Sequence, residues 1–280
     1  MIRQTRLGTL PSHALASVLS ACGLGLLIWL GISIAMLQGR SAELAALRSM
    51  QQSGLMIACV LALAGIVNMR VPAGGKWRRV GMMALAMALV FAVAVMRLLA
   101  GQRPDPGWLF MASALMSIGA VTAVLAAGMA MAASGRQSWR SQMVAPNFLA
   151  FALLAGATLL FALIAMKWPG QDLLSAPTPS LVMLVVVVAA LKLLYWFENG
   201  GLHARVAVLS DKDAPWLRLA ALALLALFPL LLTGILALWP QLVPRAGWCL
   251  IALSVVAGGC LERRLLAAEA GYPVRDADSG

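Results

Sequence analysis

The sequence predicts an integral membrane protein built from α-helices. Hydrophobic residues fill 62% of its 280 positions, charged residues fill 11%, and the mean hydropathy is +0.91. A water-soluble domain of this composition would lack the polar side chains that its surface requires. Continuous apolar runs recur along almost the whole chain, and their length of about 20 residues is what a helix needs to cross a bilayer.

A helical bundle fits these runs better than a β-barrel does. The strands of a membrane barrel alternate apolar and polar residues, whereas the runs here are continuously apolar. Each helix also satisfies its own backbone hydrogen bonds inside the lipid. We predict an all-α fold with a single membrane domain over residues 1–280, a bundle of eight transmembrane helices at residues 14–37, 53–69, 80–98, 107–134, 144–166, 179–196, 216–238 and 247–266.

The first four spans are separated by charged or helix-breaking residues. Arg3 and Arg6 precede the first span, which is longer than the hydrophobic region of a signal peptide, so we expect a retained helix. The cationic segment NMRVPAGGKWRR (residues 68–79) follows the second span, and the motif RPDPG (residues 103–107) follows the third. Proline, glycine and charges of this kind belong at the membrane surface, so they bound the spans.

The last four spans are bounded in the same way. The motif WPGQD (residues 168–172) follows the fifth span, and LKLLYW (residues 191–196) ends the sixth. Pro229 is the only candidate break inside the seventh span. Two proline-containing pairs at residues 239–240 and 244–245 precede the eighth span, which ends in LERRLLAAEA (residues 261–270).

Two further patterns fit a membrane bundle. The fourth span contains Gly119, Ala123 and Ala127 at four-residue spacing, and such a stripe of small residues lets another helix pack closely. Eight of the nine tryptophans lie at or next to span ends, where the indole ring prefers the headgroup region. Trp29 is the exception, and we interpret it as helix packing inside the first span.

The distribution of positive charge predicts the orientation. When each Lys and Arg is assigned to its nearest span end, 15 of the 21 lie with the two termini and the loops after the second, fourth and sixth spans. The positive-inside tendency predicts that this side, with both termini, is cytoplasmic. We expect the chain to lie in the inner membrane of a bacterium. The net charge of +11 is then a signal of topology within membrane lipid, and we expect no binding to nucleic acid.

The chain contains few residues that could bind a cofactor. Its only histidines, His13 and His203, lie outside the spans or at their edges, so a transmembrane haem with two histidine ligands is not expected. The four cysteines lie in apolar spans without metal-ligand spacing, and we interpret them as small packing residues. No phosphate loop, serine-hydrolase motif or metalloprotease motif occurs. We therefore expect no haem and no metal.

Charged side chains near the predicted cytoplasmic ends are the remaining candidates for function. Lys192 shares a helix face with Tyr195 and Trp196, although its ammonium group could simply extend to the interface. Glu262 shares a face with Glu269, seven residues later. Because a carboxylate at this depth is costly unless it is paired, we predict an interhelical contact between Glu262 and either Lys192 or a nearby arginine.

Several stretches resemble the membrane anchor subunits of dimethyl sulfoxide reductase, the DmsC family, which are eight-helix proteins of similar length. The closest stretches are LKLLYW and LERRLLAAEA at the ends of the sixth and eighth spans. The segments LSACGLG (residues 19–25) and WRSQMVAP (residues 139–146) are similar to the family's first helix and to its loop after the fourth helix. The resemblance covers most of the chain.

Membership of this family would imply a role in electron transport. An iron-sulfur subunit and a molybdopterin catalytic subunit would dock on the anchor and exchange electrons with membrane quinone, either menaquinone or ubiquinone. The anchor itself would hold no metal centre and would bind the quinone near the membrane surface. The candidates for partner docking or interhelical polar contacts are Trp139, Arg140, Lys192, Tyr195, Glu262 and Arg263.

The chain departs from the family after the second span. Asn68 stands where the family has a histidine, and the family's acidic position falls near Val80. Both family residues are implicated in quinol binding, so the usual groups are missing. The residues that remain as candidates for binding a quinone are Asn68, Arg70, Lys76, Trp77 and Arg79.

Two alternatives stay open at this point. The departures after the second span also fit a purely structural anchor that has lost quinone binding. A small-molecule transporter belongs to a different functional class and usually has charges or helix breaks near the membrane midplane. Pro229 is the only such break that the sequence indicates, and no charge is expected near a midplane.

Overall fold

The computed structural model describes residues 10–37, 44–67, 75–101, 105–133, 142–167, 178–198, 213–239 and 244–269. Within these ranges nearly every residue is helical and no β-strand occurs, which confirms the all-α fold class for this part of the chain. The helices are α1 (Leu10–Leu37), α2 (Leu44–Val67), α3 (Gly75–Ala100), α4 (Pro106–Ala132), α5 (Val144–Lys167), α6 (Thr178–Glu198), α7 (Asp213–Leu222), the π-helix η2 (Ala223–Leu227), α8 (Phe228–Leu238) and α9 (Pro244–Glu269).

Seven segments of the described chain are long and apolar enough to cross a membrane. The last of them combines α7, η2 and α8, and α9 is not among the seven although it has 26 residues. The chain is therefore a multi-pass membrane protein, while the eighth predicted span stays a prediction. The seven segments are Ala14–Leu37, Leu47–Ala64, Gly75–Ala100, Pro106–Ala132, Val144–Lys167, Pro179–Glu198 and Pro215–Leu238.

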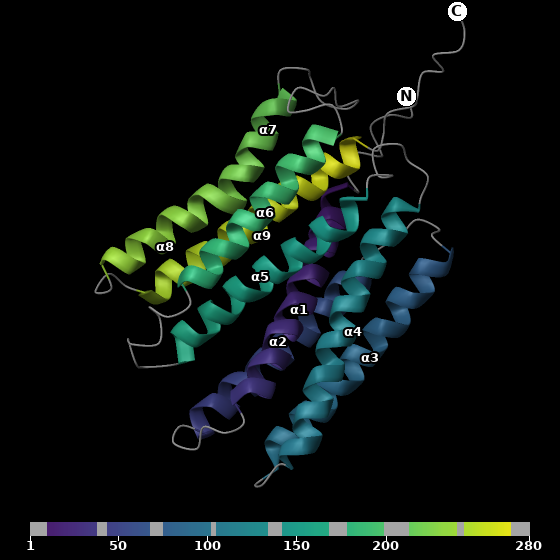
Figure 1. Cartoon of the computed structure of the whole chain (residues 1–280), viewed down its shortest axis with the longest axis vertical. Helices are drawn as coiled ribbons and strands as arrows, with labels where there is room; N and C mark the ends of the chain where they lie inside the picture. Colours follow the sequence, from purple (N-terminus) through teal and green to yellow (C-terminus); the bar gives the residue numbers. More distant parts are fainter. Residues whose placement is uncertain are drawn as a thin grey trace, which may run out of the picture.

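Helices α1 and α5 lie at the centre of the bundle. Helix α1 packs against α2, α4, α5 and α9, and α5 packs against α1, α4, α6 and α9. Figure 1 shows α3 and α4 on one side of this central pair and α6 to α9 on the other. Consecutive membrane segments run antiparallel, as short connections favour, with α7, η2 and α8 forming one such segment. The start of α3, the start of α5 and the ends of α6 and α9 therefore lie at one end of the bundle (Figure 1).

Two glycines allow the backbones of α1 and α5 to touch. A Cβ atom added to Gly156 would lie 2.1 Å from the carbonyl carbon of Gly25, so this contact admits no side chain. Trp29 Nε1 links the same two helices by donating a hydrogen bond of 2.8 Å to the carbonyl oxygen of Leu153. Trp29 therefore packs between helices, as predicted, and it also satisfies its N–H group inside the bundle.

The predicted stripe of small residues on α4 packs against α3. A Cβ atom added to Gly119 would lie 3.0 Å from the carbonyl oxygen of Ala84, and one added to Gly81 would lie 3.9 Å from the carbonyl oxygen of Ala123. Ala123 is buried and Ala127 is half-buried. The stripe thus serves helix packing, which is how small residues commonly act between membrane helices.

Two helices begin five or more residues before their predicted spans. Helix α2 begins at Leu44 rather than at residue 53, and α3 begins at Gly75 rather than at residue 80. The added turns contain polar residues such as Gln51 and Lys76, which a hydropathy pattern excludes although they are good helix formers. The prediction that Lys76, Trp77 and Arg79 lie in a loop is therefore wrong, because the helix continues beyond the apolar segment.

The seventh predicted span is one continuous helix with a break near its middle. In η2 the N–H group of Phe228 donates to the carbonyl oxygen of Ala223, five residues earlier. Pro229 follows directly and has no N–H group to give to the helix. The break that the sequence indicated at Pro229 is confirmed, and its form is a π-helical segment.

Candidate functional site

A cluster of buried polar side chains lies where three helix ends meet. The first turns of α5 and the last turns of α6 and α9 are at the same end of the bundle, and α5 packs against both of the other helices. Lys192, Tyr195, Glu262 and Arg263 are all at most 5% exposed. The fold therefore brings together four predicted site residues from the motifs LKLLYW and LERRLLAAEA.

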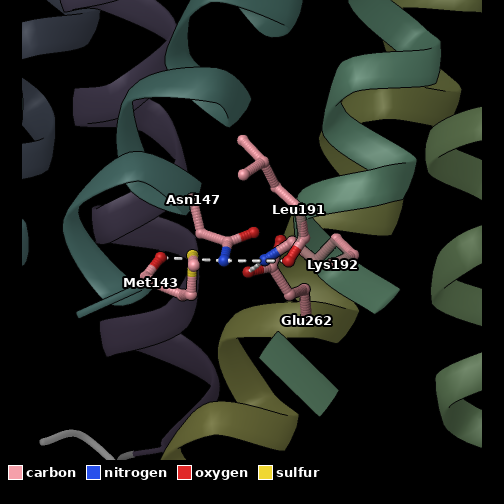
Figure 2. A network of polar contacts seen from close by, with 5 residues as sticks. All are labelled: Met143, Asn147, Leu191, Lys192 and Glu262. Atoms are coloured by element: carbon pink, nitrogen blue, oxygen red, sulfur yellow. Dashed lines mark hydrogen bonds and ion pairs between the residues drawn. The ribbon is translucent and has the colours of Figure 1, made fainter. Parts of the chain in front are cut away.

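An ion pair joins α6 and α9 at the centre of this cluster. The ammonium group of Lys192 donates a hydrogen bond to Oε1 of Glu262, as Figure 2 shows. The predicted interhelical contact of Glu262 is therefore present, with Lys192 as the partner. Two opposite charges this deep in a protein hold each other, because removing either one leaves the other buried and uncompensated, at a cost of about 3–5 kcal/mol.

Asn147 connects α5 to the same place. Its Nδ2 atom donates to the carbonyl oxygen of Met143 at 2.8 Å and to the carbonyl oxygen of Leu191 at 3.3 Å. Leu191 directly precedes Lys192, so the amide fixes the α6 backbone beside the ion pair (Figure 2). The sequence analysis missed Asn147. Its signal was an amide side chain within an otherwise apolar span, where a polar group needs a partner.

Arg263 is buried next to the ion pair. Its Nε, Nη1 and Nη2 atoms have no partner within the part of the chain that the structure describes. The Cζ atom lies 3.4 Å from the ring centroid of Phe148 and 5.6 Å from that of Phe151. A guanidinium group over an aromatic face gains about 2 kcal/mol when it is desolvated. Phe148 and Phe151 therefore stabilise this charge, and the sequence analysis did not single them out.

Gly259 explains how Phe151 reaches α9. A Cβ atom added to Gly259 would lie 2.3 Å from Cζ of Phe151, so the ring packs directly on the α9 backbone. Gly259 is four residues before Arg263, and residues at this spacing share a helix face. The absence of a side chain at Gly259 therefore leaves space for the Phe151 ring beside Arg263.

The space inside the cluster is small. A void of about 10 Å³ is lined by Val144, Asn147, Phe148, Lys192, Tyr195 and Leu266. A volume of this size corresponds to roughly one water molecule, so a quinone ring does not fit between these helices. The cluster is therefore an electrostatic joint between α5, α6 and α9, and it does not enclose a cofactor-sized cavity.

The residues predicted to bind quinone lie apart from this joint. The first turns of α3 contain the exposed Lys76 and Arg79 and the half-buried Trp77. The ammonium group of Lys76 lies 5.9 Å from the ring centroid of Trp77. Helix α3 packs mainly against α4 and also meets α2, whereas the joint belongs to α5, α6 and α9. Four other predicted site residues lie outside the described residues: Asn68, Arg70, Trp139 and Arg140.

Groups that could bind a metal ion are scarce in the described residues. No three His, Cys, Asp or Glu side chains there gather closely enough to hold one. The four cysteines are free, and Cys22 is buried within α1.

The chain matches no known family model and no curated protein. The resemblance to the DmsC family therefore stays a prediction from the sequence motifs.

Proposed function

We propose that the chain is the membrane anchor subunit of an oxidoreductase complex of the dimethyl sulfoxide reductase type. The supporting observation is the ion pair between Lys192 and Glu262. These two residues belong to LKLLYW and LERRLLAAEA, the motifs that carry the resemblance, so the ion pair links the two motifs directly. An iron-sulfur subunit and a molybdopterin subunit would dock at this end of the bundle.

The proposal includes a topology of eight crossings, with α9 as the eighth. Both termini and the docking end are then cytoplasmic in a bacterial inner membrane. Single cysteines introduced at Arg78 and Trp108, in a chain whose four native cysteines are replaced, test the orientation of α3 in this arrangement with a membrane-impermeant thiol reagent. We expect labelling of residue 78 only in inside-out vesicles and of residue 108 only in right-side-out vesicles. Labelling of both from one side would contradict the topology.

Quinone exchange is assigned to the first turns of α3. Lys76 and Arg79 are exposed donors that can hydrogen-bond a quinone carbonyl, and the half-buried Trp77 offers an aromatic face for the headgroup. Asn68 and Arg70 are close by in the sequence. A quinol bound here would lose two electrons to the iron-sulfur subunit and release two protons, while the chain itself supplies position and hydrogen bonds.

Purification from native membranes tests the anchor function. An affinity-tagged chain is solubilised in mild detergent, and the proteins that co-purify are identified and assayed for molybdenum and iron. We expect two partners, one with a molybdopterin and one with iron-sulfur clusters. An exposed variant such as Arg245→Gln, in the first turn of α9, serves as the control that keeps the complex intact. Purification of the chain without metal-containing partners would overturn the proposal.

A purely structural anchor is distinguished by quinol turnover. In the intact complex, Lys76→Ala and Arg79→Ala should each lower the rate of quinol oxidation, while the amount of co-purified partner stays the same. If quinol oxidation persists unchanged in the double variant, the first turns of α3 do not bind quinone. If the complex forms but never oxidises or reduces quinone, the chain is a structural anchor only.

Transport of a small molecule is the second candidate function. The observation in its favour is the π-helical segment η2 with Pro229, near the middle of the span Pro215–Leu238, because interrupted helices often form transport sites. Neither the void in the buried joint nor the larger cavity between α3 and α4 is lined by this break, and η2 packs against α9 and α6. Net uptake of a solute by vesicles that contain only this chain would favour transport over the anchor function.

A further inference from the structure

A groove runs between α3 and α4 at the end of the bundle opposite the buried joint. Its volume is about 380 Å³, and it is lined by Phe91, Ala94, Arg97, Leu98, Trp108, Met111, Ala112 and Leu115. Six of these eight residues are apolar and lack any polar side-chain group. The two exceptions, Arg97 and Trp108, lie at the same end of the groove, because α3 is close to its last residue there and α4 is close to its first.

The surroundings of the groove are lipid-facing. Val93 on α3 and Phe110 and Met111 on α4 are apolar and at least half exposed. Because both helices belong to segments that can cross a membrane, these side chains face lipid. From Phe91 to Leu98 the groove follows α3 for about 10 Å, at roughly 1.5 Å per residue. An apolar channel of this length, open to the bilayer, has the shape and chemistry to hold part of an acyl chain.

The polar end of the groove lies at the depth of lipid headgroups. Arg97 is exposed, it is three residues before the end of α3, and it has no ion-pair partner within the described ranges. Trp108 is 65% exposed, and its indole group is of the kind that gathers in the headgroup region. The carboxylate of Asp105 is engaged in capping α4, since its Oδ1 atom accepts a hydrogen bond of 2.8 Å from the N–H group of Gly107.

We propose that this groove binds one phospholipid, with the phosphate on Arg97 beside Trp108 and an acyl chain along Phe91, Ala94 and Leu115. The guanidinium fork of arginine matches the oxygens of a phosphate group, which explains why a cation stands at the rim of an otherwise apolar channel. The site serves to hold the α3–α4 hairpin in the bilayer. It rests on observations separate from those behind the proposed function.

Native mass spectrometry of the purified full chain in detergent tests the site. The probes are phosphatidylglycerol, diacylglycerol with the same chains, inorganic phosphate and a short-chain ubiquinone. We expect one tightly bound phosphatidylglycerol, weaker binding of diacylglycerol and no retention of inorganic phosphate. Arg97→Gln should weaken phosphatidylglycerol binding by about tenfold or more, since a hydrogen bond between charged groups is lost. Arg78→Gln, on the exposed opposite end of α3, is the matched control and should leave binding unchanged.

A second variant separates the apolar part of the site from its charge. Ala94→Phe fills the groove without altering Arg97, and it should also weaken phosphatidylglycerol binding. Added phosphatidylglycerol should raise the melting temperature of the wild-type chain more than that of either groove variant. Equal binding of diacylglycerol and phosphatidylglycerol would overturn the proposal, as would unchanged binding in Arg97→Gln. Tighter binding of ubiquinone than of phosphatidylglycerol would replace the phospholipid with a quinone as the occupant.

Discussion

Ser254 on α9 donates a hydrogen bond of 2.7 Å to the carbonyl oxygen of Leu224, inside the π-helical segment η2. In a regular helix this carbonyl would accept from the N–H group of Phe228, which donates to Ala223 instead. The next backbone nitrogen belongs to Pro229 and carries no hydrogen. The hydroxyl group of a neighbouring helix therefore supplies the donor that the break removes, which is how membrane proteins tolerate proline within a span.

The first prediction concerns this substitute donor. Ser254→Ala should lower the free energy of unfolding by about 1 kcal/mol, because the Leu224 carbonyl loses its donor inside the bundle. The effect should be smaller in a Pro229→Ala background, where the backbone N–H of residue 229 is restored. Unfolding in mixed detergent micelles, followed by tryptophan fluorescence, measures both values. Ser33→Ala is the control, since its hydroxyl donates only to Leu30 within α1.

The second prediction concerns the ion pair of the buried joint. Glu262→Gln and Lys192→Met should each destabilise the bundle by about 3–5 kcal/mol, because each leaves one buried charge without its partner. The double variant should be less destabilised than the sum of the two single variants, since it removes both charges. Glu198→Gln, at the exposed end of α6, should change stability by less than about 1 kcal/mol. Additive effects in the double variant would show that the pair contributes nothing.

The third prediction concerns the stacked arginine. Phe148→Leu and Arg263→Met should show a coupling energy of about 2 kcal/mol in a double-mutant cycle, because each substitution removes the same cation–π contact. Phe161→Leu provides the comparison, since Phe161 packs against Trp248 at a centroid distance of 5.1 Å and no arginine of the described ranges lies over its ring. A coupling with Arg263→Met as large for Phe161 as for Phe148 would rule out a specific contact.

The fourth prediction concerns the contact between α1 and α5. Gly156→Ala should destabilise the bundle by more than about 3 kcal/mol, because the added methyl group meets the Gly25 backbone and the two central helices must separate. Gly234→Ala is a matched control on α8, where nothing lies within 4 Å of the added atom. This control should be neutral or gain up to about 1 kcal/mol from helix propensity. Thermal unfolding in detergent compares the two variants.

The sequence predicted the helices well because hydropathy acts locally. Six of the eight predicted spans agree with helices to within a few residues at each end. The starts of α2 and α3 were placed too late, since polar helix formers such as Gln51 and Lys76 continue a helix without adding hydropathy. The form of the break at Pro229 was also beyond the sequence, because proline permits a kink, a bulge or an end of the helix.

Of the buried joint, the sequence predicted the carboxylate and its need for a partner. Glu262 lies in an apolar helix at a depth where an isolated charge is costly, and this cost is a property of the residue and its depth alone. The sequence left Lys192 and the neighbouring arginines as alternatives. It also gave no sign that Asn147 and Phe148 would face the same point, since they are more than 40 residues from either charge.

What the sequence determined by itself is therefore the membrane class, the approximate position of most helices, and the residues that could not remain unpaired. The tertiary structure decided which partner each residue found: Glu262 pairs with Lys192, and Arg263 lies over Phe148. The physical reason is that burial and backbone hydrogen bonding act within one helix, whereas an ion pair or a stacked ring depends on how neighbouring helices are rotated and spaced. In this chain that rotation and spacing depend on glycine contacts such as Gly25 with Gly156.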